Sequence, residues 1–155
     1  MRRVVITGVG AIAPNGNSDP RMWEALCNGR SGIGRVTAFD PSPFPTRFGG
    51  EVKGFDPGAW VSPKDARRMD RFVQFAVAAA KMAVADSGID LETQDRGRVG
   101  VIVGSGIGGI KTIEDQHTLM VTKGPQRISP FFIPMLIVNM APGMIAMQLK
   151  VKGPN

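Results

Sequence analysis

Two short apolar runs, each ending in a glycine-rich motif, constrain the fold of this chain most strongly. The first run is RRVVIT at residues 2–7, followed by GVGAIA, and the second is RVGVIV at residues 98–103, followed by GSGIGG. Short runs rich in β-branched residues that stop at glycine are typical of buried strands. We therefore expect two buried strands, each followed by a tight turn of the backbone.

Both glycine motifs match the G-x-G-x-x-G/A pattern of dinucleotide-binding loops, but their surroundings do not. In such a loop a helix begins at the motif, and an acidic residue follows about 20 positions later. After GVGAIA, Pro14, Gly16 and Pro20 oppose a helix, and no carboxylate lies near Arg30. After GSGIGG the corresponding stretch is TKGPQR, again without an acid. A Rossmann oxidoreductase is thus a disfavoured rival, and we expect no cofactor. The glycines instead indicate places where a neighbouring segment packs too close for a side chain.

The first half of the chain predicts a helix, a long irregular excursion and a second helix. The first helix begins at Ser18–Pro20 and stops at Gly29, with Cys27 on its packing side. The excursion covers about residues 30–61, is rich in proline and glycine, and contains a short strand at 48–53. No base near Cys27 in the sequence favours a thiolate, so we expect a packing role for it.

The clearest helical pattern is SPKDARRMDRFVQFAVAAAKMAVADSG at residues 62–88. Ser62 caps it, Pro63 takes the first helical position, and Asp65 completes an S-x-x-D capping box. Apolar residues then follow at helical spacing until Gly88 closes the helix.

The last third predicts two helices around a loop. A helix at 109–121 carries His117, the only histidine, for which we expect a structural or surface role. A proline-punctuated loop at 124–134 follows, and then an apolar helix at 135–149 that Pro142 should kink. This alternation predicts an α/β fold without an internal boundary across residues 1–155.

Charge and composition narrow the partners. The net charge is +6, from 19 Lys and Arg against 13 Asp and Glu, which favours an acidic partner. One cluster of cations stands out, formed by Lys64, Arg67, Arg68 and Arg71. Aromatic residues do not alternate with the basic ones, so nucleic acid is not expected. No apolar run approaches the roughly 20 residues that span a bilayer, and we expect no membrane partner.

Cysteine and histidine usage points to an intracellular chain without a metal. The single cysteine excludes an internal disulfide and suits a reducing cytoplasm, which is where we expect the protein. No paired Cys/His spacing typical of a metal site is present.

Five segments, taken together and in order, resemble the β-ketoacyl-[acyl-carrier-protein] synthases of type II. They are VVITGVGAIAPNGN, FDPSPFPTRFGGEVKGFD, RRMDRFVQFAVAAAKMAVADSG, VGVIVGSGIGGI and RISPFFIPMLIVNMAPGMIAMQLKVKGPN. The resemblance covers essentially the whole chain. It implies a thiolase-like layered α/β fold, of which this chain is the first, N-terminal half and therefore incomplete, and it implies a homodimer.

The resemblance also implies an acyltransferase of fatty acid biosynthesis. In that family an acyl group on an enzyme cysteine is condensed with malonyl carrier protein, giving 3-oxoacyl carrier protein and CO2. The family nucleophile follows the segment that ends here as KGPN, so we expect it beyond Asn155, and the family's histidines come later still. Neither Cys27 nor His117 matches a catalytic position. These residues alone should be inactive, and they should expose apolar surface around 131–149.

Three sets of site residues carry over from the resemblance. Ile107 matches the residue that lines and gates the acyl pocket, and Phe132 and Ile133 match positions that cap this pocket from the neighbouring subunit. Lys64, Arg67 and Arg68, with Arg127, match the basic surface that receives the acidic acyl carrier protein.

Two alternative functions stay open: a non-catalytic chain-length partner in a polyketide synthase heterodimer, and a condensing enzyme of polyketide synthesis.

Overall fold

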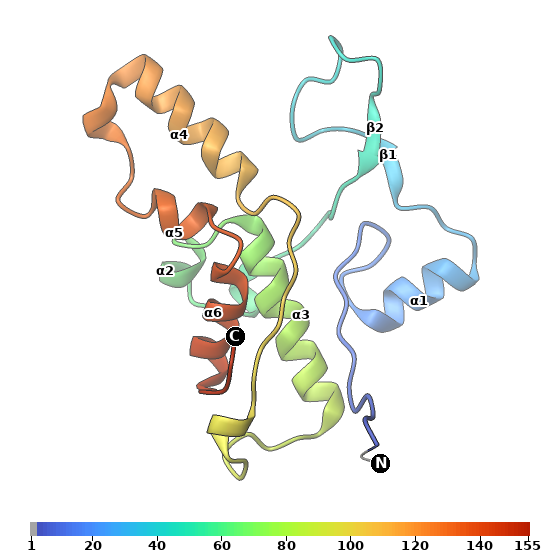
Figure 1. Cartoon of the computed structure of the whole chain (residues 1–155). Helices are drawn as coiled ribbons and strands as arrows, with labels where there is room; N and C mark the ends of the chain where they lie inside the picture. The colour runs from blue at the N-terminus through green and yellow to red at the C-terminus, as the bar shows by residue number, and fades with distance from the viewer. Residues whose placement is uncertain (1–2) are drawn as a thin grey trace. The chain divides into compact units, whose positions relative to one another are not determined.

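The computed structural model describes residues 3–155. The chain forms two compact units (Figure 1). The first comprises the chain up to Asp56 together with Ala79–Gly88, and the second comprises Pro57–Ala78 and Ile89–Asn155. Helix α3 (Arg71–Ser87) contributes to both units. That residues 1–155 form one segment without an internal boundary stays a prediction.

The first unit contains helix α1 (Asp19–Cys27) and a two-stranded antiparallel sheet. Helix α1 confirms the predicted helix, and Gly29 just after its end has a φ of 64°. Strand β2 (Phe48–Gly50) lies within the predicted strand at 48–53 and pairs with β1 (Ile33–Arg35). The sequence IGR of β1 has no pattern that predicts a strand, so β1 is identified only from its pairing with β2 in the structure.

Most of helix α1 is exposed, which corrects the packing role predicted for Cys27. Only Ala25 of this helix is buried, while Trp23 and Leu26 are 67% and 53% exposed. The Cys27 thiol is exposed as well. Residues 3–155 therefore cover the helix at Ala25 and leave Trp23 and Leu26 largely exposed.

The first glycine motif lies against the second half of α3, as expected from its lack of side chains. A Cβ atom added to Gly8 would lie 2.3 Å from the Ala83 carbonyl oxygen, and one added to Gly10 would lie 2.2 Å from that of Ala79. The Val9 amide donates a 2.9 Å hydrogen bond to the Asp86 carboxylate. Any side chain at Gly8 or Gly10 would therefore push the N-terminal segment away from the helix.

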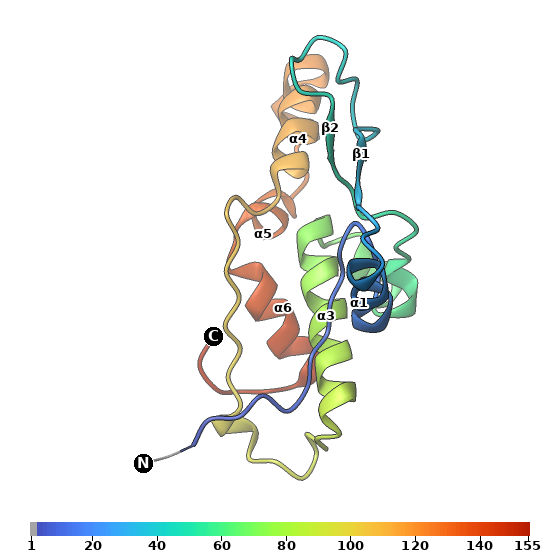
Figure 2. The same cartoon turned by 90° about the vertical axis from the view of Figure 1, so that its right-hand side faces the viewer.

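The strands predicted at 2–7 and 98–103 are not formed, and residue 2 lies outside the described residues. Residues 3–7 and 99–103 are neither helical nor paired in a strand ladder (Figure 2). Val4 and Ile102 are 96% and 97% exposed, so the predicted burial is wrong as well. A strand needs a ladder partner, and the part of the chain from residue 3 onward supplies none for either run. The start of the second run forms a turn bond from the Arg98 amide to the Asp95 carbonyl and two longer-range backbone hydrogen bonds, with residues 153 and 154.

The predicted helix at 62–88 is divided into α2 (Pro63–Ala66) and α3. The Ser62 cap is confirmed, because the Asp65 amide donates a 3.1 Å hydrogen bond to the Ser62 hydroxyl. The reciprocal bond of a capping box is replaced, since the Asp65 carboxylate accepts from the Ser62 hydroxyl at 2.9 Å. The Arg68 and Met69 amides then donate to carbonyls three residues earlier, as in a turn, and α3 begins after Asp70, whose carboxylate accepts from the Phe72 amide at 3.3 Å. An acidic side chain that caps a new helix explains the division.

The remaining helices belong to the second unit. They are α4 (Ile110–Lys123), α5 (Phe132–Leu136) and α6 (Met140–Leu149), with short 3-10 turns at Pro57–Ala59, Arg96–Arg98 and Pro125–Arg127. Helix α4 confirms the helix expected at 109–121. His117 on this helix is exposed, which agrees with the surface role expected for it.

The apolar stretch at 135–149 differs from its prediction in where it bends. The chain interrupts the helix at 137–139, and Pro142 lies in the first turn of α6. Proline is tolerated there because the first amides of a helix have no intrahelical acceptor. Ala141 and Ile145 are buried, whereas Ile133 and Met147 are 55% and 60% exposed. The expected exposure of apolar surface around 131–149 is therefore present.

The core of the second unit comes mainly from the first half of α3 and from α6. Its buried apolar residues are Val61, Met69, Val73, Val77, Ala78, Ala141, Ile145, Ala146 and Val151.

Among residues 3–155 no helix is both long and apolar enough to cross a bilayer.

Candidate functional site

Helix α2 and the residues after it present three cations on one exposed surface. Lys64 lies in the helix, Arg67 is its C-terminal cap, and Arg68 follows. All three residues are exposed. With Ser62, Pro63 and Phe131 they line a hollow of about 580 Å³. We call Lys64, Arg67 and Arg68 the basic cluster.

Two other cations from the sequence lie outside this hollow. Arg127 is exposed at the end of the 3-10 turn Pro125–Arg127, which packs against α4. Arg71 begins α3, where its guanidinium carbon lies 4.8 Å from the centre of the Phe75 ring. The hollow therefore brings together three of the four residues predicted to dock a carrier protein.

Phe131 joins the basic cluster to the segment that follows it. The Arg68 guanidinium carbon lies 4.6 Å from the centre of the Phe131 ring. The Phe131 amide donates to the Ser129 hydroxyl at 3.2 Å, and the Ser129 amide donates to the Gln116 side chain of α4 at 2.7 Å. Sequence reasoning missed Phe131, because the pair of adjacent phenylalanines does not indicate which ring meets a cation.

Phe132 and Ile133 form the first turn of α5, directly after Phe131. Phe132 is half-buried and Ile133 is 55% exposed. The two residues expected to cap an acyl pocket thus both lie on α5, and the residue before this helix, Phe131, contacts Arg68 of the basic cluster.

Ile107 lies in the turn that leads into α4 and is 61% exposed. The turn around it is tightly packed: Gly108 has a φ of 82°, and a Cβ added to it would lie 2.3 Å from the Leu136 carbonyl oxygen. The Gly109 amide donates to the same oxygen at 2.9 Å. Gly104 and Gly106 have no atom within 4 Å of such a Cβ, so only the last part of the GSGIGG motif shows the expected close approach.

A buried polar pair holds α3 and α4 together at this turn. The Asp70 carboxylate accepts hydrogen bonds from the Thr112 hydroxyl at 2.5 Å and from the Thr112 amide at 3.3 Å. Asp70 and Thr112 are only 9% and 7% exposed. No local sequence signal identifies this pair, because the two residues lie 42 positions apart in the chain.

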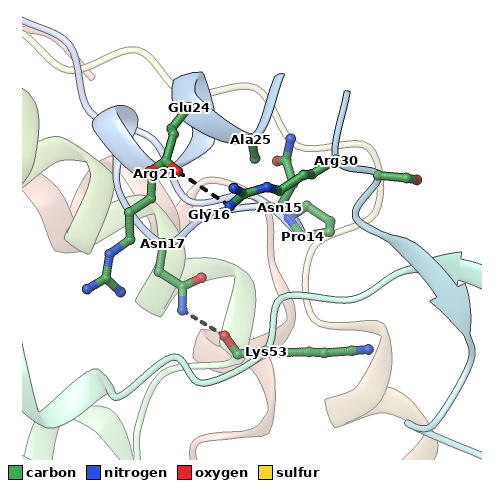
Figure 3. A pocket seen from close by; sticks show the side chains of 10 residues that line it. Pro14, Asn15, Gly16, Asn17, Arg21, Glu24, Ala25, Arg30 and Lys53 are labelled. Atoms are coloured by element: carbon green, nitrogen blue, oxygen red, sulfur yellow. Dashed lines mark hydrogen bonds and ion pairs between the residues drawn. The ribbon is translucent and has the colours of Figure 1, made fainter. Parts of the chain in front are cut away.

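A second pocket, of about 510 Å³, lies in the first unit (Figure 3). Its cations are Arg21, Arg30 and Lys53. Arg30 forms an ion pair with Glu24 at 3.4 Å, and the side chains of Arg21 and Lys53 point away from one another (Figure 3). The cations do not converge on a common point, so this pocket is not built as an anion site.

The described residues contain no group of three or more His, Cys, Asp or Glu side chains that could hold a metal ion. Cys27 belongs to the first unit and His117 to the second. The arrangement in residues 3–155 thus consists of an exposed basic surface and exposed apolar side chains, with Cys27 and His117 on separate elements.

A family model named "Beta-ketoacyl synthase, N-terminal domain" matches residues 1–155. The chain belongs to the beta-ketoacyl synthase family. The resemblance noted in the sequence is thereby confirmed.

Curated relatives in this family share about half of their aligned residues with the chain. It is 50% identical over 154 residues to 3-oxoacyl-[acyl-carrier-protein] synthase 2 of Synechocystis sp. and 49% identical to that of Coxiella burnetii. Each alignment covers 99% of this chain and 37% of the relative. The chain therefore spans a little over a third of the length of these relatives.

The fold agrees with solved structures of the same family. The structure titled "The ishigamide ketosynthase/chain length factor" matches 99% of this chain and 38% of its own chain, with a TM-score of 0.88 and 31% identity. This confirms the thiolase-like α/β fold, of which the chain forms the N-terminal part.

Proposed function

We propose that this chain works as the N-terminal part of a 3-oxoacyl-[acyl-carrier-protein] synthase of type II in fatty acid elongation. The observation that carries the proposal is the identity of 50% with a synthase of that name over nearly the whole chain. In the proposed reaction, malonyl carrier protein loses CO2, and its carbanion forms a carbon–carbon bond with the thioester carbonyl of an acyl-enzyme. The enzyme thiolate leaves, and 3-oxoacyl carrier protein is the product.

The basic cluster would receive the carrier protein. Lys64, Arg67 and Arg68 are exposed around one hollow, as a surface that attracts an acidic protein requires. Exposed cations of this kind act mainly on the rate of encounter and weaken with salt. Arg127 would extend the surface.

Ile107, Phe132 and Ile133 would form part of the acyl pocket. Ile107 and Ile133 are more than half exposed, so both side chains are available to contact a further apolar surface. We propose that a second subunit and the acyl chain together supply that surface, so that the enzyme is a homodimer.

We also propose a cytoplasmic location, in keeping with the single cysteine.

A second candidate is a chain-length partner without its own nucleophile. The identity of 31% with a ketosynthase/chain length factor supports this second candidate, whereas the identity of 50% with a 3-oxoacyl-[acyl-carrier-protein] synthase 2 favours an enzyme that catalyses condensation. Neither Cys27 nor His117 is proposed as catalytic.

A condensation assay separates the two. The purified synthase that carries this segment is incubated with an acyl thioester of acyl carrier protein and with malonyl carrier protein that is radiolabelled at C-2, a carbon that the product retains. We expect labelled 3-oxoacyl carrier protein and release of CO2. Product that forms only after a separate ketosynthase is added would support the chain-length partner instead. Lack of product in both mixtures would contradict both functions.

A further inference from the structure

Arg68 differs from the other members of the basic cluster because it lies on an aromatic ring. Its guanidinium carbon is 4.6 Å from the centre of the Phe131 ring, within the range of a cation–π interaction. Lys64 and Arg67 line the same hollow, but among the described residues neither has such a ring contact. The three cations are therefore similar in charge and exposure and different in what they touch.

The ring that Arg68 contacts belongs to Phe131, the residue immediately before α5. The Phe131 carbonyl accepts the 2.9 Å hydrogen bond of the Met135 amide, which closes the first turn of the helix. The position of Phe131 thus determines where α5 begins, and with it the positions of Phe132 and Ile133.

The other end of α5 is joined to the turn that carries Ile107. The Leu136 carbonyl accepts the Gly109 amide at 2.9 Å, and the backbone of Gly108 packs against the same oxygen. Helix α5 therefore connects Arg68 at its start with the Ile107 turn at its end.

Stacking on a ring leaves the edge of a guanidinium free. The planar group uses its face for the ring, and its N–H donors point outward in the plane. The Arg68 side chain has no hydrogen bond or ion pair with residues 3–155 in the structure. It can therefore hold Phe131 and contact a carboxylate of a partner at the same time.

We infer that Arg68 is a positioning residue for α5 in addition to a contact for an acidic partner. Through the Phe131 ring it holds the helix that carries Phe132 and Ile133, so that the surface that docks the carrier protein and the segment that meets the acyl chain are mechanically joined. This inference rests on the proposed function and adds to it a residue that affects acyl-chain preference without touching the acyl chain.

The test uses matched variants of the complete synthase. Arg68→Gln and Arg67→Gln remove the same charge from the same hollow, but only the first removes the ring contact. Phe131→Leu keeps apolar bulk and removes the ring, and Arg68→Lys keeps the charge and loses the planar face. Arg35→Gln, on strand β1, controls for net charge. Two readouts are needed: the KM for acyl carrier protein, and the ratio of kcat values for a long and a short acyl chain.

We expect Arg67→Gln to raise KM and leave the kcat ratio unchanged. Arg68→Gln should raise KM similarly and also change the kcat ratio by about two- to fivefold, the range expected from an exposed cation–π pair. Phe131→Leu and Arg68→Lys should change the ratio in the same direction with little effect on KM. The double variant Arg68→Gln/Phe131→Leu should change the ratio no further than Phe131→Leu does.

An equal kcat ratio in Arg68→Gln and Arg67→Gln would overturn the inference, as would effects on the ratio that simply add in the double variant. A thermal unfolding curve of each variant identifies any that fails to fold. If Arg68→Gln fails to fold, Arg68→Lys takes its place in the comparison of kcat ratios. If KM is unchanged in both glutamine variants, the docking role fails, while the kcat ratio still decides the positioning role.

Discussion

The Asp70 carboxylate accepts a 2.5 Å hydrogen bond from the Thr112 hydroxyl, which lies 42 positions further along the chain. The same side chain accepts the Phe72 amide at the start of α3. One buried carboxylate therefore fixes the starts of both α3 and α4. Because α3 follows the basic cluster and α4 follows the Ile107 turn, this bond holds together the two segments on which the proposed function depends.

Replacing Thr112 by valine should destabilise the protein. The valine keeps the size of the side chain but leaves a buried carboxylate oxygen without its hydroxyl donor, at a cost of about 1–3 kcal/mol. Thermal unfolding of Thr112→Val should show a clearly lower Tm than Thr112→Ser, which keeps the hydroxyl. Equal Tm values for the two variants would show that the bond contributes nothing.

Glycine at position 109 should be far less replaceable than glycine at position 104. A Cβ added to Gly109 would lie 2.5 Å from the Met135 carbonyl oxygen, whereas one added to Gly104 meets no atom within 4 Å. Gly109→Ala must displace α5 from the turn, so we expect a loss of more than about 1 kcal/mol, as for other overpacked sites. Gly104→Ala is the matched control in the same motif. Similar unfolding curves for the two alanine variants would contradict the packing described for this turn.

The elements that could be predicted from the sequence are those with local signals. Ser62 caps α2 through the Asp65 amide, as the local sequence predicts, and proline and glycine mark both ends of α1. The strands at 2–7 and 98–103 could not be predicted correctly from their own residues, because strand formation depends on a partner elsewhere.

The site divides in the same way. The charges of Lys64, Arg67 and Arg68 are visible in the sequence, and their nearness follows from helical spacing. The contact between Arg68 and Phe131 and the bond between Asp70 and Thr112 join residues far apart along the chain. Neither pair carries a pattern that local reasoning detects, so only the folded chain reveals them.

A larger side chain at position 107 should shorten the products of the synthase. Ile107 lies beside a turn that Gly108 and Leu136 hold tightly, so a phenylalanine cannot be accommodated by moving the backbone. In the proposed pocket the added volume of Ile107→Phe displaces the end of the acyl chain. We expect chromatography of the products to show a shift toward shorter acyl chains, with Ile107→Val as the control of smaller volume. An unchanged product distribution in Ile107→Phe would rule out the gating role.

The loop between β1 and β2 should loosen in acid. The pKa of Glu51 is held below its ordinary value of 4.5, first by the hydrogen bond from the Thr37 hydroxyl and then by those from the Thr37 and Ala38 amides. A lowered pKa means that this contribution to stability is complete above the ordinary value and is lost as the pH falls through the folded-state pKa.

Amide hydrogen exchange of Thr37 and Ala38 measures this loosening. Between about pH 6 and about pH 3, protection of both amides should fall in the wild type, after correction for intrinsic exchange. In Glu51→Gln, protection should not depend on pH over this range. A wild-type profile that matches that of the glutamine variant would show that Glu51 does not hold the loop.

The central claim is that the basic cluster receives an acidic carrier protein, and the dissociation constant of that complex tests it most directly. Calorimetry on the synthase should give a Kd for acyl carrier protein that rises with salt, because exposed charges are screened over about 10 Å at 0.1 M ionic strength. The double variant Lys64→Glu/Arg67→Glu should bind at least about tenfold more weakly at low salt and lose most of the salt dependence. Arg35→Glu, which reverses a charge on β1, should bind like the wild type. Equal Kd values for the wild type and the double variant at every ionic strength would contradict the account.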